Sequence, residues 1–381
     1  MRIVFISSLL PSGHFSEILC ASLQKYTDLD IAIYADTDPR NKHIKTCKNV
    51  KTVWRKGPWF MIDILKELRK DKPDAVHIQQ ELNMYGGGIT VLLFPLLLFC
   101  IKLLHIRVIT TIHAAVYKKE IDKRFISLFL MKPPWFMRPF MLTFVFNCLF
   151  LLISWFSDSV VCHSYMLQDI LTKDYGVQKY KSWVIRTIIP KVKGLTHSKD
   201  AYFLVFGYIV RRKGLKNLID EFSTFHRNHS NFKLILAGGS IPGQEQARDE
   251  VVEYVRRKKM NDYIIFTGFV NKKRIDTLYK HAYAVVIPAY ISMGSSGPLY
   301  HAQSYGKCIL ASNIGHFKED VKNNINGILV DHTQWSEKLS LVVDNQEVTS
   351  RLEQGVRNEA KKKSPRIIAT KYRDMYHSLL K

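Results

Sequence analysis

Acidic side chains are scarce in this 381-residue chain. Its 33 aspartates and glutamates stand against 56 lysines and arginines, so the formal net charge is +23. Such an excess predicts an anionic partner: nucleic acid, a phosphorylated substrate or acidic lipid. A nucleic-acid-binding protein fits the charge alone, because the sequence contains no recognisable recognition module. We therefore expect a phosphorylated ligand and an anionic membrane surface, and no nucleic acid.

Paired cysteines are also absent. The six cysteines, at positions 20, 47, 100, 148, 162 and 308, lack the spacing of a zinc site or a disulfide framework, which favours a reducing cytosol. Asp36-Thr37-Asp38 could suggest a metal site, but it follows the second predicted strand, away from the other polar residues discussed below. We expect no metal and no cofactor. No charged leader with a cleavage site is present, so we expect no signal peptide.

Long apolar runs are few. Val91–Leu104 is interrupted by Pro95 and Lys102 and is too short to span a bilayer, whereas Phe140–Phe156 is borderline. A spanning helix there would separate strands that we expect in one sheet. We therefore predict a crossover helix whose outer face rests on the inner side of the cytoplasmic membrane, flanked by tryptophan and basic anchors. A fully buried crossover helix is the alternative.

What the sequence does contain is an alternation of strand-like and helix-like segments from end to end, which is typical of parallel α/β sheets. Its length suits two domains. We predict two Rossmann-like α/β domains facing each other across a cleft, over residues 1–194 and 195–364, and a closing helix over 365–381. The predicted strands are 3–7, 31–34, 75–79, 107–113, 159–164 and 183–185, then 202–207, 232–239, 263–267, 284–288, 308–312 and 327–331.

In the first half, polar residues gather just past the carboxyl ends of the predicted strands. They are His14, Gln80, Glu81, His113 and Ser164. Open α/β sheets bind their ligands at this edge, so we expect a ligand there.

One stretch organises the second half. A buried apolar run leads into a turn rich in glycine and serine at Gly294–Gly297, and Pro298 stands where a helix should begin. Ser295 or Ser296 can cap that helix, whose N-terminus offers N–H groups and a positive dipole end to an anion. The same residues also fit an ordinary strand-to-helix turn.

A basic loop is a second anion-binding candidate. It follows the strand end Phe206-Gly207 and contains Arg211, Arg212 and Lys213. Arg212 or Lys213 could neutralise a diphosphate, although a basic loop without a ligand would have the same composition.

Several motifs occur in an order and at spacings that resemble one family. They are Phe206-Gly207 with Lys213-Gly214, Leu236-Ala237-Gly238-Gly239, Phe266-Thr267-Gly268-Phe269-Val270, Ser296-Gly297 with Tyr305-Gly306-Lys307, and Ala311-Ser312-Asn313-Ile314-Gly315. Together with 76–81, 110–113 and 161–164 in the first half, they look like family-four glycosyltransferases, which have the two-domain GT-B fold. The resemblance covers most of the chain.

The resemblance implies transfer of a sugar from a nucleoside diphosphate sugar, usually with retention at the anomeric carbon. In that family, fixed cations and N–H groups stabilise the charge that the leaving diphosphate gains. The implied catalytic residues are Lys213, Arg212 and His113; the implied donor-binding residues are Gly13, Gly207, Gly239, Phe269, Val270, Gly294, Ser295, Ser296, Gly297, Leu299 and His301; and His14, Gln80 and Glu81 fall on the acceptor side.

The chain departs from the family's pattern at three positions. Tyr208 replaces a frequent arginine, for which Arg211 or Arg212 can substitute. Met293 and His301 replace two frequent glutamates, so the sugar and the stereochemistry stay open. These departures also suit a nucleotide- or glycan-binding relative that has lost catalysis.

The sequence thus predicts a membrane-peripheral glycosyltransferase that acts on a lipid-linked or oligosaccharide acceptor in surface polysaccharide assembly. We expect a UDP-sugar as donor rather than a GDP-sugar. A GT-B enzyme of another reaction, such as a nucleotide-sugar epimerase, is the second enzymatic alternative. The sequence leaves the oligomeric state open.

Overall fold

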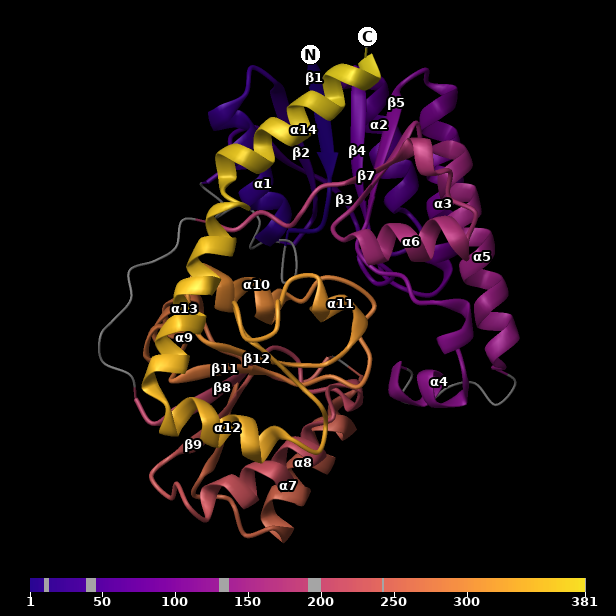
Figure 1. Cartoon of the computed structure of the whole chain (residues 1–381). Helices are drawn as coiled ribbons and strands as arrows, with labels where there is room; N and C mark the ends of the chain where they lie inside the picture. Colours follow the sequence, from indigo (N-terminus) through magenta and orange to yellow (C-terminus); the bar gives the residue numbers. More distant parts are fainter. Residues whose placement is uncertain (10–13, 39–45, 130–136, 191–199, 242, 381) are drawn as a thin grey trace. The chain divides into compact units, whose positions relative to one another are not determined.

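The computed structural model describes residues 1–9, 14–38, 46–129, 137–190, 200–241 and 243–380 (Figure 1). Contacts between residues divide the chain into two compact units. Unit 1 comprises Met1–Lys119, Arg138–Pro190 and Lys363–Lys381, and unit 2 comprises Glu120–Met137 and Lys191–Lys362.

Unit 1 is built on a seven-stranded sheet in which every neighbouring pair is parallel, in the order β3-β2-β1-β4-β5-β6-β7. The order reverses between β1 and β4, which creates a switch point of the kind where such sheets bind ligands. Its main elements are β1 (Arg2–Ile6), α1 (His14–Tyr26), β2 (Asp30–Asp36), β3 (Val50–Trp54), α2 (Phe60–Asp71), β4 (Ala75–Gln80), α3 (Ile89–Leu103), β5 (Arg107–Ile112), α5 (Pro139–Phe156), β6 (Ser159–Cys162), α6 (Tyr165–Lys173), β7 (Ser182–Val184) and α14 (Pro365–Leu380).

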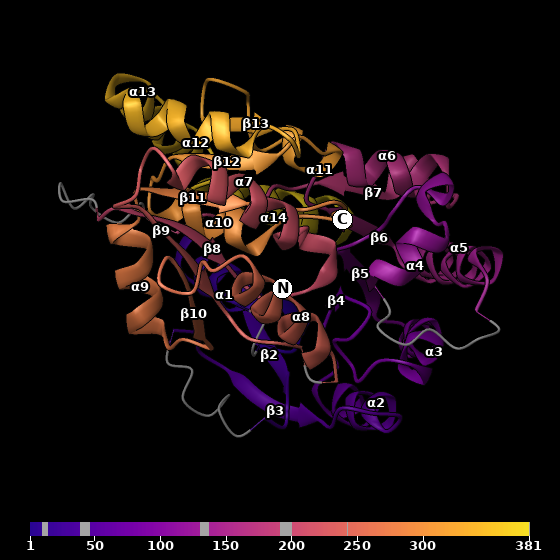
Figure 2. The ribbon, with the colours of Figure 1, turned by 90° about the horizontal axis from the view of Figure 1, so that it is seen from below.

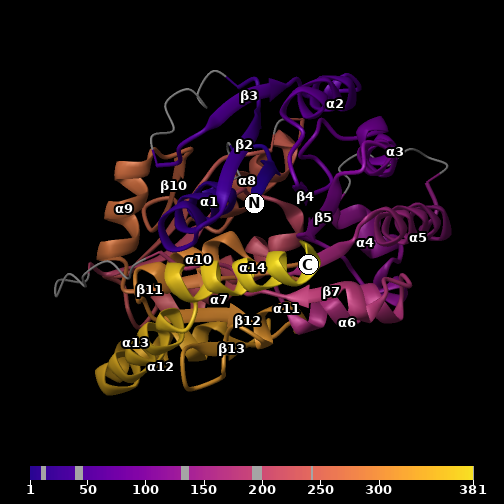
Figure 3. The ribbon, with the colours of Figure 1, turned by 90° about the horizontal axis from the view of Figure 1, so that it is seen from above.

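Helices cover both faces of this sheet, and its central strands are therefore apolar on both faces. Ile3 and Phe5 of β1 belong to a core that also contains buried residues of α1 and α14. Val4 and Ile6 point to the opposite face and are equally buried. Figure 2 and Figure 3 show α2, α3 and α5 side by side, away from α1 and α14.

The last helix, α14, completes the core of unit 1. Ile368, Tyr372 and Tyr376 are fully buried there. The Tyr376 hydroxyl lies 2.5 Å from Nδ1 of His77, whose Nε2 lies 2.6 Å from the Thr111 hydroxyl. Burial lowers the pKa of His77 to about 3, so its imidazole is neutral and can both donate and accept in this chain of hydrogen bonds.

Unit 2 contains a six-stranded parallel sheet in the order β10-β9-β8-β11-β12-β13, with its switch point between β8 and β11. Its elements are α4 (Lys123–Phe129), β8 (Tyr202–Phe206), the short 3-10 helix η4 (Arg211–Lys213), α7 (Leu215–His226), β9 (Lys233–Ala237), α8 (Glu245–Arg257), β10 (Ile264–Gly268), α9 (Lys272–His281), β11 (Ala284–Ile287), α10 (Gly297–Ser304), β12 (Ile309–Ser312), α11 (Gly315–Lys318), β13 (Ile328–Val330), α12 (Trp335–Asp344) and α13 (Gln346–Lys361).

Unit 2 is also covered on both faces of its sheet. Phe203 and Val205 of β8 pack in one core with α7 and α12, and Tyr202 and Leu204 pack in a second core with α9 and α10. Because successive side chains of a strand point to opposite faces, the two cores lie on opposite sides of the sheet.

The predicted fold of two parallel α/β domains is confirmed, and each of the twelve predicted strands coincides with a strand of the structure. The strand β3 was not predicted. It lies at the edge of its sheet, only Trp54 in it is buried, and Lys51 and Thr52 interrupt its apolar pattern. Its conformation depends on pairing with β2, which periodicity does not reveal.

The unit boundaries differ from the predicted domains by a few residues at 191–194 and 363–364, and by one longer segment. The sequence placed residues 120–137 in the N-terminal domain, whereas in the structure they group with unit 2, where α4 contacts η4. The predicted linker, 195–200, lies outside the described residues except for Asp200.

The apolar helix α5 lies, in the sequence, between two strands that are neighbours in the sheet. It is long and apolar enough to cross a membrane, and about a quarter of it is buried (28%). However, β5 before it and β6 after it are hydrogen-bonded parallel neighbours in one sheet. Because paired strands cannot lie on opposite sides of a bilayer, α5 is a crossover helix.

The Tyr376 hydroxyl should contribute measurably to the stability of unit 1. We expect Tyr376→Phe to lower the free energy of unfolding by about 1–3 kcal/mol, because Nδ1 of the buried His77 loses a partner. Urea denaturation is the measurement. Tyr180→Phe, which removes an exposed hydroxyl bonded to Gln178, is the control and should change stability by less than about 0.5 kcal/mol. Equal effects of the two substitutions would contradict the proposed contribution.

Candidate functional site

Three parts of unit 2 meet at Gly207. A Cβ atom on this glycine would lie 3.3 Å from Nζ of Lys213 and 3.5 Å from Cγ of Pro298. Gly207 has φ of +97°, in the region that favours glycine. The carboxyl end of β8, the basic loop η4 and the first turn of α10 are thus in contact at the switch point of the sheet, where such sheets bind their ligands.

The Lys213 side chain folds back onto the strand that precedes it. Its Nζ donates a hydrogen bond of 2.8 Å to the carbonyl oxygen of Phe206. Burial, and secondly the neighbouring Arg212, lower the pKa of Lys213 to about 7. An anion beside this amine would favour its charged form and raise the pKa again. The site therefore holds an ammonium group whose charge a bound anion would stabilise.

The helix α10 begins as predicted, with Ser296 as its cap. The Ser296 hydroxyl accepts a 3.4 Å hydrogen bond from the backbone N–H of Leu299, and Pro298 occupies the first turn. The Leu299 side chain is buried in the core. Any contact of Leu299 with a ligand would therefore involve only its main chain. Gly294 and Ser295 precede the cap, and the Ser292 hydroxyl donates to the Gly294 carbonyl at 2.9 Å.

Of the two arginines that could replace the arginine expected at position 208, Arg211 already has a partner. Its Nε lies 3.3 Å from Oε2 of Glu250, and its Nη2 bonds the other carboxylate oxygen. The Arg212 guanidinium instead lies over the ring of Phe129, 5.2 Å from its centroid. A carboxylate thus balances the charge of Arg211, whereas the Arg212 guanidinium packs on an aromatic ring.

Two aromatic rings flank the glycine loop that follows β9. The Phe269 ring packs on Gly239, where a Cβ atom would approach the ring to 2.4 Å. Phe269 is 71% exposed, and Tyr208 meets it edge-on at 5.9 Å between centroids. An exposed ring of this kind can stack on a planar base. Val270 packs against the core of unit 2.

His301 lies among aromatic rings at the end of β8. Its ring centroid is 5.6 Å from that of Phe206 and 5.5 Å from that of Tyr279. Met293, at the other position where the family often has a glutamate, is buried. The structure thus brings Gly207, Lys213, α10 and His301 together, while their roles toward a ligand stay predictions.

In unit 1, His113 follows β5 and bonds a residue that sequence reasoning missed. Its Nε2 donates to Oε1 of Gln79 at 2.8 Å, and its ring lies 5.1 Å from that of His163. Burial, then His163 and His77, lower the pKa of His113 well below its usual value. His113 is therefore neutral, with Nδ1 as an acceptor. The position of Gln79 at the end of β4 was the available signal.

The remaining residues predicted in unit 1 do not all surround His113. Gln80 is buried and lines a cavity of about 10 Å³ with Tyr85 and Thr90, and Glu81 is exposed. The Ser164 hydroxyl caps α6 by accepting from the backbone N–H of Leu167. Gly13 lies outside the described residues, as does the side chain of His14, the first residue of α1.

Asp36, the first aspartate of the motif that could suggest a metal site, has structural partners. Asp36 is buried, 3.1 Å from Nζ of Lys56, and accepts a hydrogen bond from Ser8. Within the described ranges, no group of three or more histidine, cysteine, aspartate or glutamate side chains could hold a metal ion.

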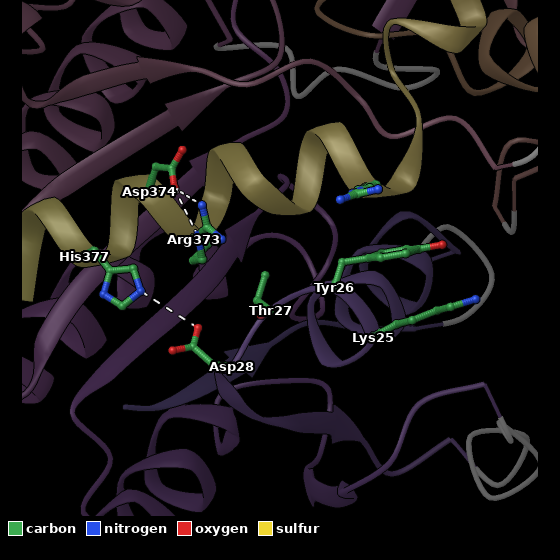
Figure 4. A pocket seen from close by; sticks show the side chains of 8 residues that line it. Lys25, Tyr26, Thr27, Asp28, Arg373, Asp374 and His377 are labelled. Atoms are coloured by element: carbon green, nitrogen blue, oxygen red, sulfur yellow. Dashed lines mark hydrogen bonds and ion pairs between the residues drawn. The ribbon is translucent and has the colours of Figure 1, made fainter.

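A wider hollow of about 930 Å³ lies elsewhere in unit 1, between the end of α1 and α14 (Figure 4). Its acids have basic neighbours: Asp374 bonds Arg373 at 2.8 Å, and Asp28 lies 3.9 Å from His377. It adjoins Asp30, the first residue of β2, at the amino end of the strand. Parallel sheets bind ligands at the opposite edge, and none of the predicted site residues lines this hollow.

Comparison with known families identifies the chain. The model described as "Glycosyltransferase Family 4" matches residues 9–190, and that described as "Glycosyl transferases group 1" matches residues 189–361. The chain belongs to glycosyltransferase family four. The resemblance carried by the glycine motifs is thereby confirmed.

Similar proteins of this family include two uncharacterized glycosyltransferases. One, from Methanocaldococcus jannaschii, is 29% identical over 131 residues, which are 34% of this chain and 32% of that protein. The other, from Bacillus subtilis, is 23% identical over 206 residues, which are 51% of this chain and 55% of that protein. The matched parts thus span only a third to about half of these relatives.

Solved structures show the same GT-B fold over nearly the whole chain. HepE of Anabaena, solved in complex with UDP-glucose, has a TM-score of 0.76 at 14% identity, covering 99% of this chain and 100% of that one. A glycosyltransferase from Rickettsia africae has a TM-score of 0.74 at 17% identity, covering 100% and 98%. Sucrose-phosphate synthase from Thermosynechococcus elongatus has a TM-score of 0.72 at 15% identity, covering 100% and 99%.

The hydrogen bond between Gln79 and His113 generates a prediction about protonation. We expect the His113 imidazole to stay neutral at the pH near 6.5 where an ordinary imidazole protonates, because burial and two neighbouring histidines lower its pKa. Gln79→Glu places a carboxylate at the hydrogen-bonding position and should raise the pKa of His113, so that protonation begins at higher pH. NMR of the ring nitrogens measures both states.

The matched control is Gln168→Glu, which introduces the same charge at a glutamine bonded to Ser182. It should leave the His113 titration unchanged. A His113 signal that titrates near pH 6.5 in the wild type, or one that ignores Gln79→Glu, would contradict the neutral, Gln79-bound imidazole.

Proposed function

We propose that this protein transfers a sugar from a nucleoside diphosphate sugar, with retention at the anomeric carbon, as its family usually does. The observation that carries the proposal is the meeting of Lys213, Gly207 and the first turn of α10 at the switch point of unit 2. A half-buried amine and a helix N-terminus that both lie close to the same glycine form an anion site, and a diphosphate is the anion that this family releases.

The geometry supports an electrostatic mechanism. As the bond between the sugar and the diphosphate breaks, negative charge grows on the leaving oxygens. Lys213 would carry its full positive charge beside them, and Arg212 would add a second cation from the same loop. Because these groups are held in place before the reaction, they stabilise the charge without reorganising. Neutral His113 would offer an acceptor to a sugar hydroxyl rather than a second positive charge.

The donor is a UDP-sugar in this proposal. HepE, which shares the fold, has been solved with UDP and with UDP-glucose. In this chain the exposed ring of Phe269, backed by Gly239, would stack on the base. The main chain of Gly268–Val270 would line the edge of the base.

The acceptor is lipid-linked in this proposal, because unit 1 carries an apolar surface. On α3, Ile89, Leu92, Leu96, Phe99 and Leu103 are at least 40% exposed, and on α5 Phe140, Phe144 and Trp155 are more than half exposed. The two helices contact each other, with Phe99 and Phe156 5.3 Å apart. A patch of this kind marks an interaction site, and the chain's positive charge favours anionic lipid at the cytoplasmic face of the membrane.

Product analysis tests the function directly. The purified protein is incubated with a panel of UDP- and GDP-sugars and with lipid-linked saccharides from surface polysaccharide assembly, and the products are identified by mass spectrometry. Addition of one sugar to a lipid-linked acceptor supports the proposal, and NMR of the product gives the anomeric configuration. Turnover of a nucleotide sugar without any acceptor would favour an epimerase instead.

Lys213 provides the sharpest test of the diphosphate site. We expect Lys213→Ala to lower turnover on the order of 100-fold or more, as the loss of one transition-state charge contact does. Lys216→Ala is the matched control, since Lys216 lies on α7 and pairs with Glu250 at 3.5 Å. It should turn over close to the wild-type rate. If Lys213→Ala turned over at the wild-type rate, Lys213 would have no role at the diphosphate site.

The pH dependence of UDP binding checks the same residue. The pKa of Lys213 is about 7 without a ligand, and a bound anion raises it, so binding takes up a proton above pH 7. Affinity should therefore fall as the pH rises from 7 to 9, by up to about tenfold per pH unit. Below pH 7 the amine is charged in both states and adds no slope. Calorimetry should find this dependence in the wild type and lose it in Lys213→Ala.

The apolar surface of unit 1 should bind anionic liposomes. We expect the double variant Leu92→Asp with Phe144→Asp to lose binding by roughly 100-fold, because each side chain contributes about 1.5–3 kcal/mol when buried. Wild-type binding should weaken with salt, because salt screens the charge attraction. Flotation with liposomes that contain an anionic lipid is the measurement.

Leu341→Asp is the matched control, since Leu341 is an exposed leucine of unit 2. It should bind liposomes as the wild type does. If the wild type fails to float with liposomes at low salt, or if it resists alkaline extraction from membranes, a peripheral membrane contact is excluded.

A further inference from the structure

One short helix comes from the first half of the sequence but belongs to the second unit. The chain leaves unit 1 after Lys119, contributes Glu120–Met137 to unit 2, and returns to unit 1 at Arg138. Within this segment α4 contacts η4, the loop that contains Lys213. A segment inserted from elsewhere in the sequence therefore packs on the candidate diphosphate site.

Both ends of α4 engage this site through a cation on an aromatic ring. Near its start, the Arg124 guanidinium lies 5.4 Å from the ring centroid of Tyr290. At its end, the ring of Phe129 supports the Arg212 guanidinium. Cations stacked on rings in this way are typically stabilised by about 0.5–2 kcal/mol, so these contacts fix where each guanidinium lies.

Tyr290 connects Arg124 to the basic loop. Its backbone N–H donates to the carbonyl oxygen of Arg212 at 2.8 Å. Its ring lies against Gly214, where a Cβ atom would approach Cζ of the ring to 2.9 Å. Gly214 directly follows Lys213, and its φ of +64° also favours glycine. Arg124 is therefore separated from the lysine loop by a single ring.

The charge on Arg124 is available to a ligand, unlike that on Arg211. Arg211 is neutralised by Glu250. Arg124 is exposed, and it forms no ion pair with a carboxylate in the described part of the chain. The charge of Arg124 also affects His332, whose ring packs on Tyr290. Burial is the main cause that lowers the pKa of His332, and the positive charge of Arg124 is the second.

The stacking geometry leaves the donors of Arg124 free to act. A guanidinium that lies over a ring uses one face, whereas its five N–H donors point outward in its own plane. That edge matches two oxygens of a phosphate in a bidentate contact. An arginine that lies over a ring beside the lysine loop can therefore offer these donors to a phosphate.

We propose that Arg124 binds the phosphates of the donor, so that the inserted segment 120–129 completes the anion site of unit 2 with Arg212 and Lys213. This inference rests on the proposed function, since it takes a nucleoside diphosphate as the ligand. It assigns a phosphate contact to a residue that lies outside every glycine motif of the chain.

The test compares ligands that differ only in their phosphates. Dissociation constants of UDP, UMP and uridine are measured by calorimetry for the full-length wild type, Arg124→Ala and Lys123→Ala. Lys123 precedes Arg124 on α4, is exposed, and loses the same charge on substitution. We expect Arg124→Ala to weaken UDP binding about tenfold or more and to leave uridine binding unchanged, while Lys123→Ala binds UDP as the wild type does.

Two further measurements separate a phosphate contact from a structural role. Increasing salt should weaken UDP binding less in Arg124→Ala than in the wild type, because a screened charge contact is already missing. Arg124→Lys keeps the charge without the planar fork and should recover only part of the affinity. Thermal unfolding should be unchanged in Lys123→Ala and should shift by no more than the loss of one cation–π contact in the two Arg124 variants, since both side chains are exposed.

The outcomes distinguish this inference from the function on which it rests. If the wild type binds UDP, Lys213→Ala weakens it and Arg124→Ala does not, then Arg124 is no phosphate ligand and the donor site stands without it. Equal weakening by Arg124→Ala and Lys123→Ala would reduce the effect to general charge and also overturn the proposal. If the wild type binds neither UDP nor GDP, the proposed function itself fails.

Discussion

The close approach at Gly207 is the constraint on which the rest of the candidate site depends. The amine of Lys213 and the first turn of α10 both lie within about 3.5 Å of the place where a side chain would begin, so a Cβ atom there would press on Nζ of Lys213. The φ of +97° at this position also favours glycine. A second glycine continues the constraint: a Cβ atom on Gly238 would lie 2.4 Å from the carbonyl oxygen of Gly207. Because the backbone is packed this tightly at Gly207 and Gly238, side chains from other elements occupy the space at the carboxyl end of β8. The parallel order of the sheet, with its switch point between β8 and β11, brings those elements there.

The positive charge of Lys213 in this site is not balanced by a carboxylate of the described residues, unlike that of Arg211. Where a cation of the loop has a carboxylate partner, as Arg211 has in Glu250, its charge is already balanced. Lys213 is instead half-buried against a carbonyl oxygen, and desolvation lowers its pKa to about 7, so the folded protein disfavours its charged form. A binding diphosphate would provide the missing negative charge and so offset the cost of charging the amine. The preference of such a site for anions therefore follows from an ammonium group that, in the described part of the chain, has no carboxylate beside it to balance its charge.

The sequence predicted what depends on local pattern and missed what depends on pairing across the chain. Buried parallel strands and the cap at Ser296 follow from runs of apolar residues and from a serine before a proline, and both were predicted. The edge strand at Val50–Trp54 has no such run and forms only beside β2. Gln79 was missed beside Gln80 because strand alternation, not composition, decides which of the two meets His113. The grouping of α4 with unit 2 could not be predicted, since nothing in its sequence identifies Tyr290 and Arg212 as its partners.

The apolar helices α3 and α5 of unit 1 expose apolar side chains, which is unfavourable in water. A crossover helix must bury one stripe on its sheet and normally exposes polar residues on the other side. On α3 and α5 the side away from the core is also apolar, with Leu92 and Phe144 among its most exposed residues. Folding stability does not require such side chains, and exposing them together favours aggregation. Because α5 buries residues such as Phe150 and Ile153, packs on α3 and leads directly into β6, the helix cannot leave the sheet to bury that face. The apolar surface is therefore fixed to the sheet, so a separate partner, and not a movement of α5, must cover it.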